Sequence, residues 1–264
     1  MKRVFILWVV IALAFVSCEK VIDLKVNDIE EKVVIDANYD AVNQRVEVKL
    51  TTTKDVFSGS EFPAVEGALI EIIDPSGNIT TVPGIGGGNY LLTGYAPEYN
   101  SNYTLRVNYN NTLYEATTIL PSVVALDSLT QEFQEASIFG EAGYVVFMNF
   151  TDPLGANYYR AIRKVNGEYL TELSQQFIFD DTFSEGNNQK VPFFNSRYEI
   201  GDSVIVEFRS YSEESYDYYT QLFDLAGDSG NNAAPANPET NWSNGALGHF
   251  SAYGFDSKLI VIQE

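Results

Sequence analysis

The sequence predicts a mostly β protein of two β-sandwich-like domains, the second carrying one amphipathic helix. Aromatic residues are abundant, with 17 Tyr and 17 Phe, and 19 Gly residues supply turns. Short runs of alternating apolar and polar residues are separated by Asn, Gly, Pro and Asp, which is the pattern of strands joined by turns. The Pro-bearing stretch 120–123 interrupts this pattern and indicates a boundary between domains at 33–121 and 122–264.

Seven strands are expected in the first domain, each a short alternating run between turn residues. They cover residues 33–39, 45–53, 68–74, 78–82, 89–93, 103–109 and 112–119. Seven short strands with turn signals between them are typical of a sandwich, here described as Ig-like. The glycine run 84–88 precedes a strand pattern and not a helix, so it predicts a hairpin turn and not a phosphate-binding loop.

The second domain is expected to combine strands with the helix. Strands are predicted at 129–135, 144–151, 158–165, 203–210 and 250–262, the last bent at Gly254. The helix is predicted at 213–226, with Ser210 or Ser212 as its cap and acidic residues in its first turn. Its apolar stripe is Tyr216, Tyr219, Phe223 and Ala226. A stripe of this kind is more often core packing than a ligand site.

The amino terminus has the pattern of a bacterial lipoprotein signal peptide. Cationic residues at 2 and 3 precede an apolar run at 4–16, and the sole cysteine, Cys18, follows. The run is shorter than the roughly 20 residues that a membrane-spanning helix needs. We therefore expect residues 1–17 to be cleaved, Cys18 to carry the lipid as a membrane anchor, and residues 18–32 to form a tether and first strand. The alternative is a secretory peptide beside an incidental cysteine.

The charge balance limits the partners. The chain has 36 acidic and 16 basic residues, a net charge of −20, which argues against nucleic acid and anionic membrane surfaces. With Cys18 acylated, no thiol remains for a disulfide, a thiolate metal site or a nucleophile.

Catalytic groups are scarce. His249 is the only histidine, and the chain lacks a Gly-X-Ser-X-Gly elbow. A lone histidine beside glycine and phenylalanine is more often structural than a general base. We expect no enzyme and no cofactor, although two-carboxylate glycoside hydrolysis needs only Asp and Glu and stays an open alternative.

Two further segments hold candidate ligand-binding residues. Asp180, Asp181, Glu185 and Asn187 offer oxygen ligands for Ca²⁺, but their spacing is not that of an EF-hand and a solvated acidic turn is the favoured interpretation. The later segment offers amide groups and a tryptophan expected to be exposed, as in partner-binding or glycan-binding loops; its candidates are Asn237, Asn241, Trp242, Asn244 and His249. An irregular connection would use asparagine and glycine in the same way, and this structural interpretation is slightly favoured.

Several motifs carry a resemblance to a known family. They are 17–24 (SCEKVIDL), 152–153 (DP) with 157–160 (NYYR), 180–181 (DD) with Phe183 and 186–187 (GN), 215–218 (SYDY), and 237–238 (NP) with 243–248 (SNGALG). The chain resembles the Bacteroidetes lipoproteins catalogued as domain of unknown function 4249 (DUF4249). Residues 60–119 also resemble the carboxypeptidase-regulatory-like, transthyretin-like domain.

The resemblance implies an acidic cell-envelope lipoprotein, often encoded near TonB-dependent outer-membrane transporters, and it supplies no catalytic residues. Ser128 and Ser203, each after an aspartate, resemble the O-glycosylation pattern of that phylum, although either may simply begin a strand. We expect a non-enzymatic binding or accessory module at the outer membrane, facing either the periplasm or the surface, with a TonB-dependent transporter as possible partner. The alternatives are a surface glycan-binding or glycan-cleaving lipoprotein and a structural envelope component.

Overall fold

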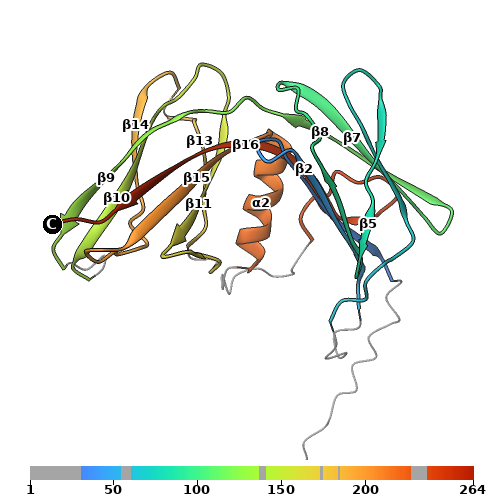
Figure 1. Cartoon of the computed structure of the whole chain (residues 1–264), viewed down its shortest axis with the longest axis horizontal. Helices are drawn as coiled ribbons and strands as arrows, with labels where there is room; N and C mark the ends of the chain where they lie inside the picture. Colours follow the sequence, from blue (N-terminus) through green and yellow to red (C-terminus); the bar gives the residue numbers. More distant parts are fainter. Residues whose placement is uncertain (1–30, 55–60, 137–140, 173–174, 184, 227–236) are drawn as a thin grey trace, which may run out of the picture. The chain divides into compact units, whose positions relative to one another are not determined.

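The computed structural model describes residues 31–54, 61–136, 141–172, 175–183, 185–226 and 237–264. Within these ranges the chain consists of strands and one helix, which confirms the mostly β, sandwich-like fold with one helix (Figure 1). The signal segment, Cys18 and nearly all of the tether lie outside the described residues.

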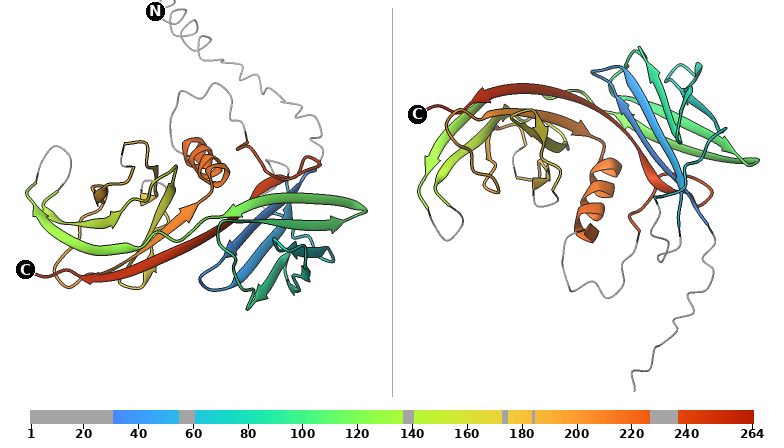
Figure 2. Two further views of the ribbon diagram at one scale, coloured as in Figure 1. Left: turned by 90° about the horizontal axis from the view of Figure 1, so that it is seen from above. Right: turned by 60° about the horizontal axis from the view of Figure 1, so that its bottom comes forward.

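Nine strands of the described chain form one large sheet, in the order β12-β11-β15-β16-β1-β2-β6-β5, with β13 paired beside β11. Their bounds are β1 Val33–Asp40, β2 Arg45–Thr52, β5 Gly84–Gly86, β6 Asn89–Thr93, β11 Tyr158–Val165, β12 Glu168–Tyr169, β13 Phe177–Asp180, β15 Ser203–Tyr211 and β16 Leu247–Val261. The first half of β16, residues 247–253, pairs in parallel with β1, and residues 254–261 pair antiparallel with β15. One strand therefore joins the two halves of the sheet (Figure 2).

Two smaller sheets complete the described strands. A four-stranded sheet has the order β4-β3-β7-β8 and a three-stranded sheet the order β14-β10-β9. Their bounds are β3 Leu69–Ile73, β4 Ile79–Thr81, β7 Ser101–Tyr109, β8 Thr112–Leu120, β9 Leu126–Gln134, β10 Gly143–Thr151 and β14 Asn188–Pro192.

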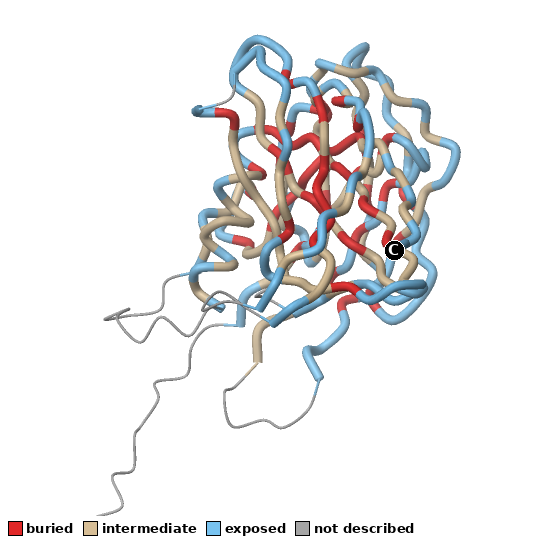
Figure 3. The backbone as a smooth tube through the Cα atoms, turned by 90° about the vertical axis from the view of Figure 1, so that its left-hand side faces the viewer, coloured by how far each residue is buried: buried red, intermediate tan, exposed pale blue. Residues whose placement is uncertain are grey.

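Each small sheet faces part of the large sheet across its own apolar core, and the buried segments can be followed in Figure 3. The first core joins residues such as Ile35 of β1 to Leu105 of β7, and the second joins Phe208 of β15 to Met148 of β10. From β16, Phe250 packs in the first core and Ile260 against the second. Alternate residues of a strand point to the same face. Both cores therefore lie on one face of the large sheet.

Helix α2, Glu213–Ala226, has the predicted bounds and cap. The backbone N–H of Ser215 donates to Ser212 Oγ at 3.3 Å, and two glutamates occupy the first turn, where the helix dipole favours negative charge. The tyrosines and phenylalanine of the predicted stripe are partly buried, whereas Ala226 is exposed. Tyr219 contacts Tyr211 of β15 at a ring distance of 5.4 Å. The helix thus packs on the face of the sheet opposite the two cores.

The strand predictions agree closely with the structure where alternation is strong. Strands β6 and β11 have the predicted bounds, and β16 begins three residues before the predicted Phe250. The change of partner strand on β16 falls between Tyr253 and Gly254, where the sequence predicts a bend. The predictions miss β5, β12, β13 and β14, which are short and gain their strand character from pairing with longer neighbours.

The predicted glycine hairpin is confirmed. Strands β5 and β6 pair antiparallel around Gly87 and Gly88, whose φ angles are +61° and +74°. Glycine adopts positive φ without steric cost, which explains the run of glycines at this turn.

The two cores do not divide the chain at residue 121. Trp242, Ala246, Phe250 and Ala252 come from the predicted second domain and pack in the first core. The division into 33–121 and 122–264 stays a prediction about which segments fold independently.

Gly248 is a sensitive position in this architecture. Its φ is +92°, and a Cβ added there would lie 2.2 Å from the Ile35 carbonyl oxygen. We expect Gly248→Ala to lower the free energy of unfolding by about 3 kcal/mol or more, because backbone strain adds to displacement of β1. Urea denaturation followed by circular dichroism measures this loss.

Gly245→Ala is the matched control, since Gly245 has a φ of +74° but open space around the added Cβ. Its expected loss is about 1 kcal/mol, from backbone strain alone. Equal losses in the two variants would show that the close approach to Ile35 has no energetic weight.

Candidate functional site

The face of the large sheet opposite the cores, named the open face here, carries most of the polar side chains that the fold brings together. Strand register aligns them in rows across β16, β1, β2 and β6. These rows are His249, Asp36, Lys49 and Asn89; Ser251, Asn38, Glu47 and Leu91; and Tyr253, Asp40, Arg45 and Thr93. Helix α2 covers the β16 end of the first two rows, and its Tyr219 hydroxyl donates to Asn38 Oδ1 on β1 at 3.3 Å. The open-face side chains of β2 (Arg45, Glu47 and Lys49) are exposed.

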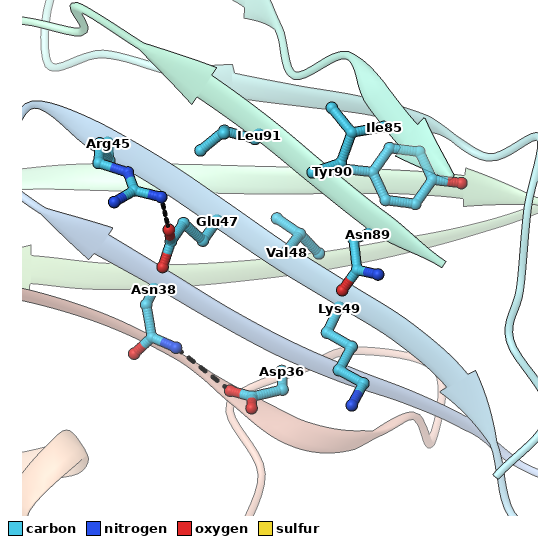
Figure 4. Close-up of a pocket in the computed structure, with 10 residues that line it drawn as sticks. All are labelled: Asp36, Asn38, Arg45, Glu47, Val48, Lys49, Ile85, Asn89, Tyr90 and Leu91. Atoms are coloured by element: carbon cyan, nitrogen blue, oxygen red, sulfur yellow. Dashed lines mark hydrogen bonds and ion pairs between the residues drawn. The ribbon is translucent and has the colours of Figure 1, made fainter. Parts of the chain in front are cut away.

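A depression of about 310 Å³ lies on the uncovered part of the open face (Figure 4). Its polar lining consists of Asp36, Asn38, Arg45, Glu47, Lys49 and Asn89, with Ile85 and Leu91 at the apolar side. Asn38 Nδ2 donates to Asp36 Oδ1 at 3.3 Å, and Arg45 forms an ion pair with Glu47. Two acidic and two basic side chains balance one another, so the depression suits a neutral polar ligand.

Asp36 lies between this depression and α2. Partial loss of its water shell raises the pKa of its carboxyl group, and the Asn38 amide and the Lys49 charge lower it in part. Lys49 stands directly opposite Asp36 on β2. This pair offers a hydrogen-bond acceptor and a cationic donor at adjacent positions.

The open face also holds a Ser–His pair that the sequence alone does not reveal. Ser215 Oγ lies 3.0 Å from His249 Nε2, and Ser212 Oγ donates to Ser215 Oγ at 3.1 Å. Tyr218 stacks on the imidazole at a centroid distance of 4.5 Å. Serine at the start of α2 thereby meets histidine at the middle of the sheet.

This pair is enclosed and not available to a substrate. Ser215 is 0% exposed and His249 is 3% exposed. Burial lowers the pKa of His249 to about 4, so the imidazole is neutral at pH 7. Among the described residues its Nδ1 has no hydrogen-bond partner, whereas a triad histidine is oriented through that atom. This geometry fits a structural role for His249, which links β16 to α2 through its bond with Ser215.

The expectation that Trp242 is exposed is wrong. Its side chain is 5% exposed, its ring lies 6.4 Å from that of Phe250, and its Nε1 donates to the Ile35 carbonyl at 3.0 Å. The tryptophan fills the first core, where a large apolar ring gains more from burial than from exposure.

The neighbouring asparagines complete backbone hydrogen bonds. Asn241 forms two bonds with the backbone of Phe250, at 2.9 and 2.8 Å, and Asn244 Nδ2 donates to the Leu113 carbonyl at 2.6 Å. Ser243 exchanges bonds with the backbone of Glu115 at 2.9 and 2.8 Å. This segment therefore covers the edge of β8, which would otherwise expose unpaired strand groups. Asn237 is exposed, and residues 227–236 lie outside the described ranges.

In the acidic turn, the candidate calcium ligands form hydrogen bonds within the chain. Asp181 is 7% exposed, and its Oδ2 accepts bonds from Asn157 N and Nδ2 at 2.9 and 3.2 Å. Asp180 Oδ1 accepts from Thr182 N at 3.1 Å, and Glu185 Oε1 from Gly155 N at 3.2 Å. Asn187 Nδ2 donates to the Glu185 carbonyl. Among the described side chains, no group of three or more His, Cys, Asp or Glu is placed to hold a metal ion.

The remaining predicted positions are on strands. Ser128 is exposed on β9, and Ser203 is half-buried at the start of β15. The Ser203 N–H donates to Asn166 Oδ1 at 3.0 Å, and its carbonyl accepts from Asn166 N at 2.9 Å. In the part of the chain that the structure describes, no helix combines the length and the apolar character of a membrane span.

The depression was not predicted, although part of its signal is in the sequence. The alternation in β1 and β2 puts Asp36 and Lys49 on the outer faces of two consecutive strands, and a hairpin between them aligns the two residues. That α2 covers β16, contacts β1 at Asn38 and leaves the outer side chains of β2 exposed depends on the helix position, which no local pattern specifies.

Trp242→Ala should lower the free energy of unfolding by about 3 to 5 kcal/mol, because it leaves a cavity in the first core. In the protein that begins at residue 18, Trp242 is the sole tryptophan, so blue-shifted, poorly quenched fluorescence reports its burial directly. Asn237→Ala, at an exposed side chain of the same segment, serves as control and should change stability by less than about 0.5 kcal/mol. Emission typical of a hydrated indole would contradict the buried position.

His249 should make stability depend on pH. Its pKa is about 4 in the folded protein and about 6.5 in the unfolded chain, so acid protonates the unfolded chain first. The histidine contribution, about 3 kcal/mol, is complete above pH 6.5 and is lost as the pH falls towards 4.

The measurement is the difference in unfolding free energy between wild type and His249→Gln across pH 4 to 7.5. The raised pKa of Asp36 acts in the opposite direction but is common to both proteins. A difference that does not vary with pH would mean that His249 titrates normally when folded.

Compared with known proteins, the chain matches no curated protein. Among solved structures, a cytokine receptor complex shares 8% identity over 87% of this chain and 95% of that chain, with a TM-score of 0.29. The FN1–FN3 domains of chicken CNTN1 share 8% identity over 68% and 60%, with a TM-score of 0.28. Chicken interferon gamma receptor alpha chain shares 12% over 67% and 86%, with a TM-score of 0.20. TM-scores this low do not establish a shared fold. The family model described as domain of unknown function (DUF4249) matches residues 19–258, and the chain belongs to this family.

Proposed function

We propose that this protein is a lipid-anchored, non-enzymatic binding module of the bacterial outer membrane that acts as an accessory to a TonB-dependent transporter. Cys18, directly after a signal-like apolar segment, supports the anchor. The depression on the open face supports a binding role, because it gathers side chains that donate and accept hydrogen bonds. The link to a transporter rests on the family resemblance, as does origin in Bacteroidetes and a transthyretin-like region at 60–119.

The observation that carries the binding role is the alignment of Asp36, Asn38 and Lys49 beside α2. Asp36 and Lys49 are opposite neighbours on rigid strands, and Asn38 bonds Asp36. Polar groups held on strands keep their geometry without a ligand, which reduces the entropy lost on binding.

A glycan-binding protein is the second candidate function, and the same depression favours it. Carboxylate, amide and ammonium groups next to the apolar side chains of Ile85 and Leu91 match the mixed polar and apolar surface of a sugar. A neutral saccharide would satisfy these groups without disturbing the charge balance.

The anchor and the partner can be tested together in native cells. Cys18→Ala should abolish metabolic labelling by a fatty-acid analogue and release the protein from membranes, because no other thiol accepts the lipid. Tagged wild-type protein, purified in detergent from native membranes, should carry a TonB-dependent transporter that mass spectrometry identifies. Label in the Cys18→Ala variant would refute the anchor, and wild-type protein recovered without a transporter would refute the accessory role.

A glycan array probed with the purified protein separates the second candidate. If the depression binds sugar, Lys49→Ala should weaken binding by about tenfold, since a hydrogen bond to a charged group contributes about 1.5 to 3 kcal/mol. Arg106→Ala is the matched control, because Arg106 is a partly exposed β-strand cation that pairs with Glu115 on the four-stranded sheet. Equal binding by wild type and both variants would exclude the depression as the sugar site.

A further inference from the structure

Two neighbouring loops display large apolar side chains in solvent. Leu154, in the β10–β11 connection, is 83% exposed, and Phe183, in the β13–β14 connection, is 100% exposed. Single exposed apolar residues are common on protein surfaces. Here two of the most exposed ones occur on loops that are bonded to each other, and this pair of loops is named the apolar tip.

Backbone and side-chain hydrogen bonds join the two loops. Asp152 N donates to the Asn187 carbonyl at 3.0 Å, and Asp181 N donates to the Asn157 carbonyl at 3.2 Å. Asn157 N donates in return to Asp181 Oδ2 at 2.9 Å. These bonds cross from one loop to the other at both ends, so the loops act as one unit.

The base of the tip is fixed to the second core. Tyr159, which is 0% exposed, donates its hydroxyl to Asp152 Oδ1 at 2.5 Å. Leu154 lies across Gly186 of the other loop, since a Cβ added at Gly186 would be 2.9 Å from Leu154 Cδ2. The oxygen groups considered above for calcium thus hold the loops in shape. A surface ordered before binding loses less entropy when a partner covers it.

The charge around the tip specifies the partner's chemistry. Segments 152–158 and 177–187 and helix α2 contain eight acidic residues, of which Asp152 and Asp181 are buried, and no lysine or arginine. The nearby cation is Arg160 of β11, whose guanidinium lies over the rings of Tyr219 and Phe223 of α2. Acidic residues of these segments and of α2 lie close to one another around Tyr158. The pKa of Tyr158 is raised mainly by burial and further by the negative charges of Glu213, Asp217 and Asp181. Acidic residues around the tip repel anionic lipid and attract a basic protein surface.

The geometry points to the apolar tip as a docking surface for a protein partner that presents an apolar pocket rimmed by lysine or arginine. Phe183 and Leu154 are its anchors, and the acidic surround pairs with the rim. This inference rests on the proposed function only for the expectation that the partner is an outer-membrane transporter.

Photo-crosslinking in native cells tests the inference on the full lipidated protein. A photoreactive phenylalanine analogue is placed at position 183, or as control at position 200, where Ile200 is 62% exposed on a separate turn. The expected result is a covalent adduct with one identified protein from position 183 and not from position 200. An adduct with lipid only, or none, would overturn the inference.

The partner identified by crosslinking is then purified without the crosslink, and its affinity for the lipoprotein is measured. Phe183→Ser and Leu154→Ser should each weaken binding by about tenfold or more, whereas Ile200→Ser should change it by less than about twofold. Binding should also weaken as salt rises, because the rim contributes through charge. All three side chains are exposed, so unchanged melting temperatures verify folding. Equal affinities of wild type and tip variants would overturn the inference.

The outcomes also separate this inference from the proposed function. If a transporter still co-purifies with both tip variants at full yield, the tip is not the docking surface, and the accessory role stands. A position-183 adduct with a protein that is not a transporter, weakened by both tip variants, supports the tip and refutes the transporter link.

Discussion

The pairing of β16 with two different strands is the constraint on which the rest of the structure depends. Its first half is parallel to β1 and its second half antiparallel to β15, so one strand closes both sandwiches. Two glycines make this possible. Gly248 lies against the β1 backbone, and a Cβ at Gly254 would be 2.5 Å from Val123 Cγ2, where the connection between the sandwiches crosses the strand. Larger residues at either position would separate β16 from its neighbours.

Because both cores lie on one face of the large sheet, the other face is free for a different use. Helix α2 occupies its centre through the buried Ser215–His249 bond and the Tyr218 stack. A neutral imidazole suits this position, since burial of a charged one without a partner is costly. The depression lies on the same face, lined by β1, β2, β5 and β6 and by no residue of α2.

Residues 241–249 have the asparagines and tryptophan of a binding loop, but their side chains serve packing. Trp242 and Asn241 have the residue types of a binding loop, yet they fill the first core and complete the backbone bonds of Phe250. The acidic turn, by contrast, is bonded internally and leaves its apolar neighbour Phe183 in solvent. In both segments polar side chains form hydrogen bonds that fix the backbone. In the acidic turn this arrangement also leaves Phe183 exposed for the proposed partner.

Local sequence patterns predict the β class, most strand positions, the span and cap of α2, and the glycine hairpin, because each of these depends on residues close together in the chain. The same alternation places Asp36 and Lys49 on the outer faces of their strands. The burial of Trp242, the contact between His249 and Ser215, and the position of α2 on the sheet follow from the tertiary fold. Those outcomes depend on contacts between residues far apart in sequence, such as Trp242 and Ile35, whose closeness follows from strand order and not from local pattern.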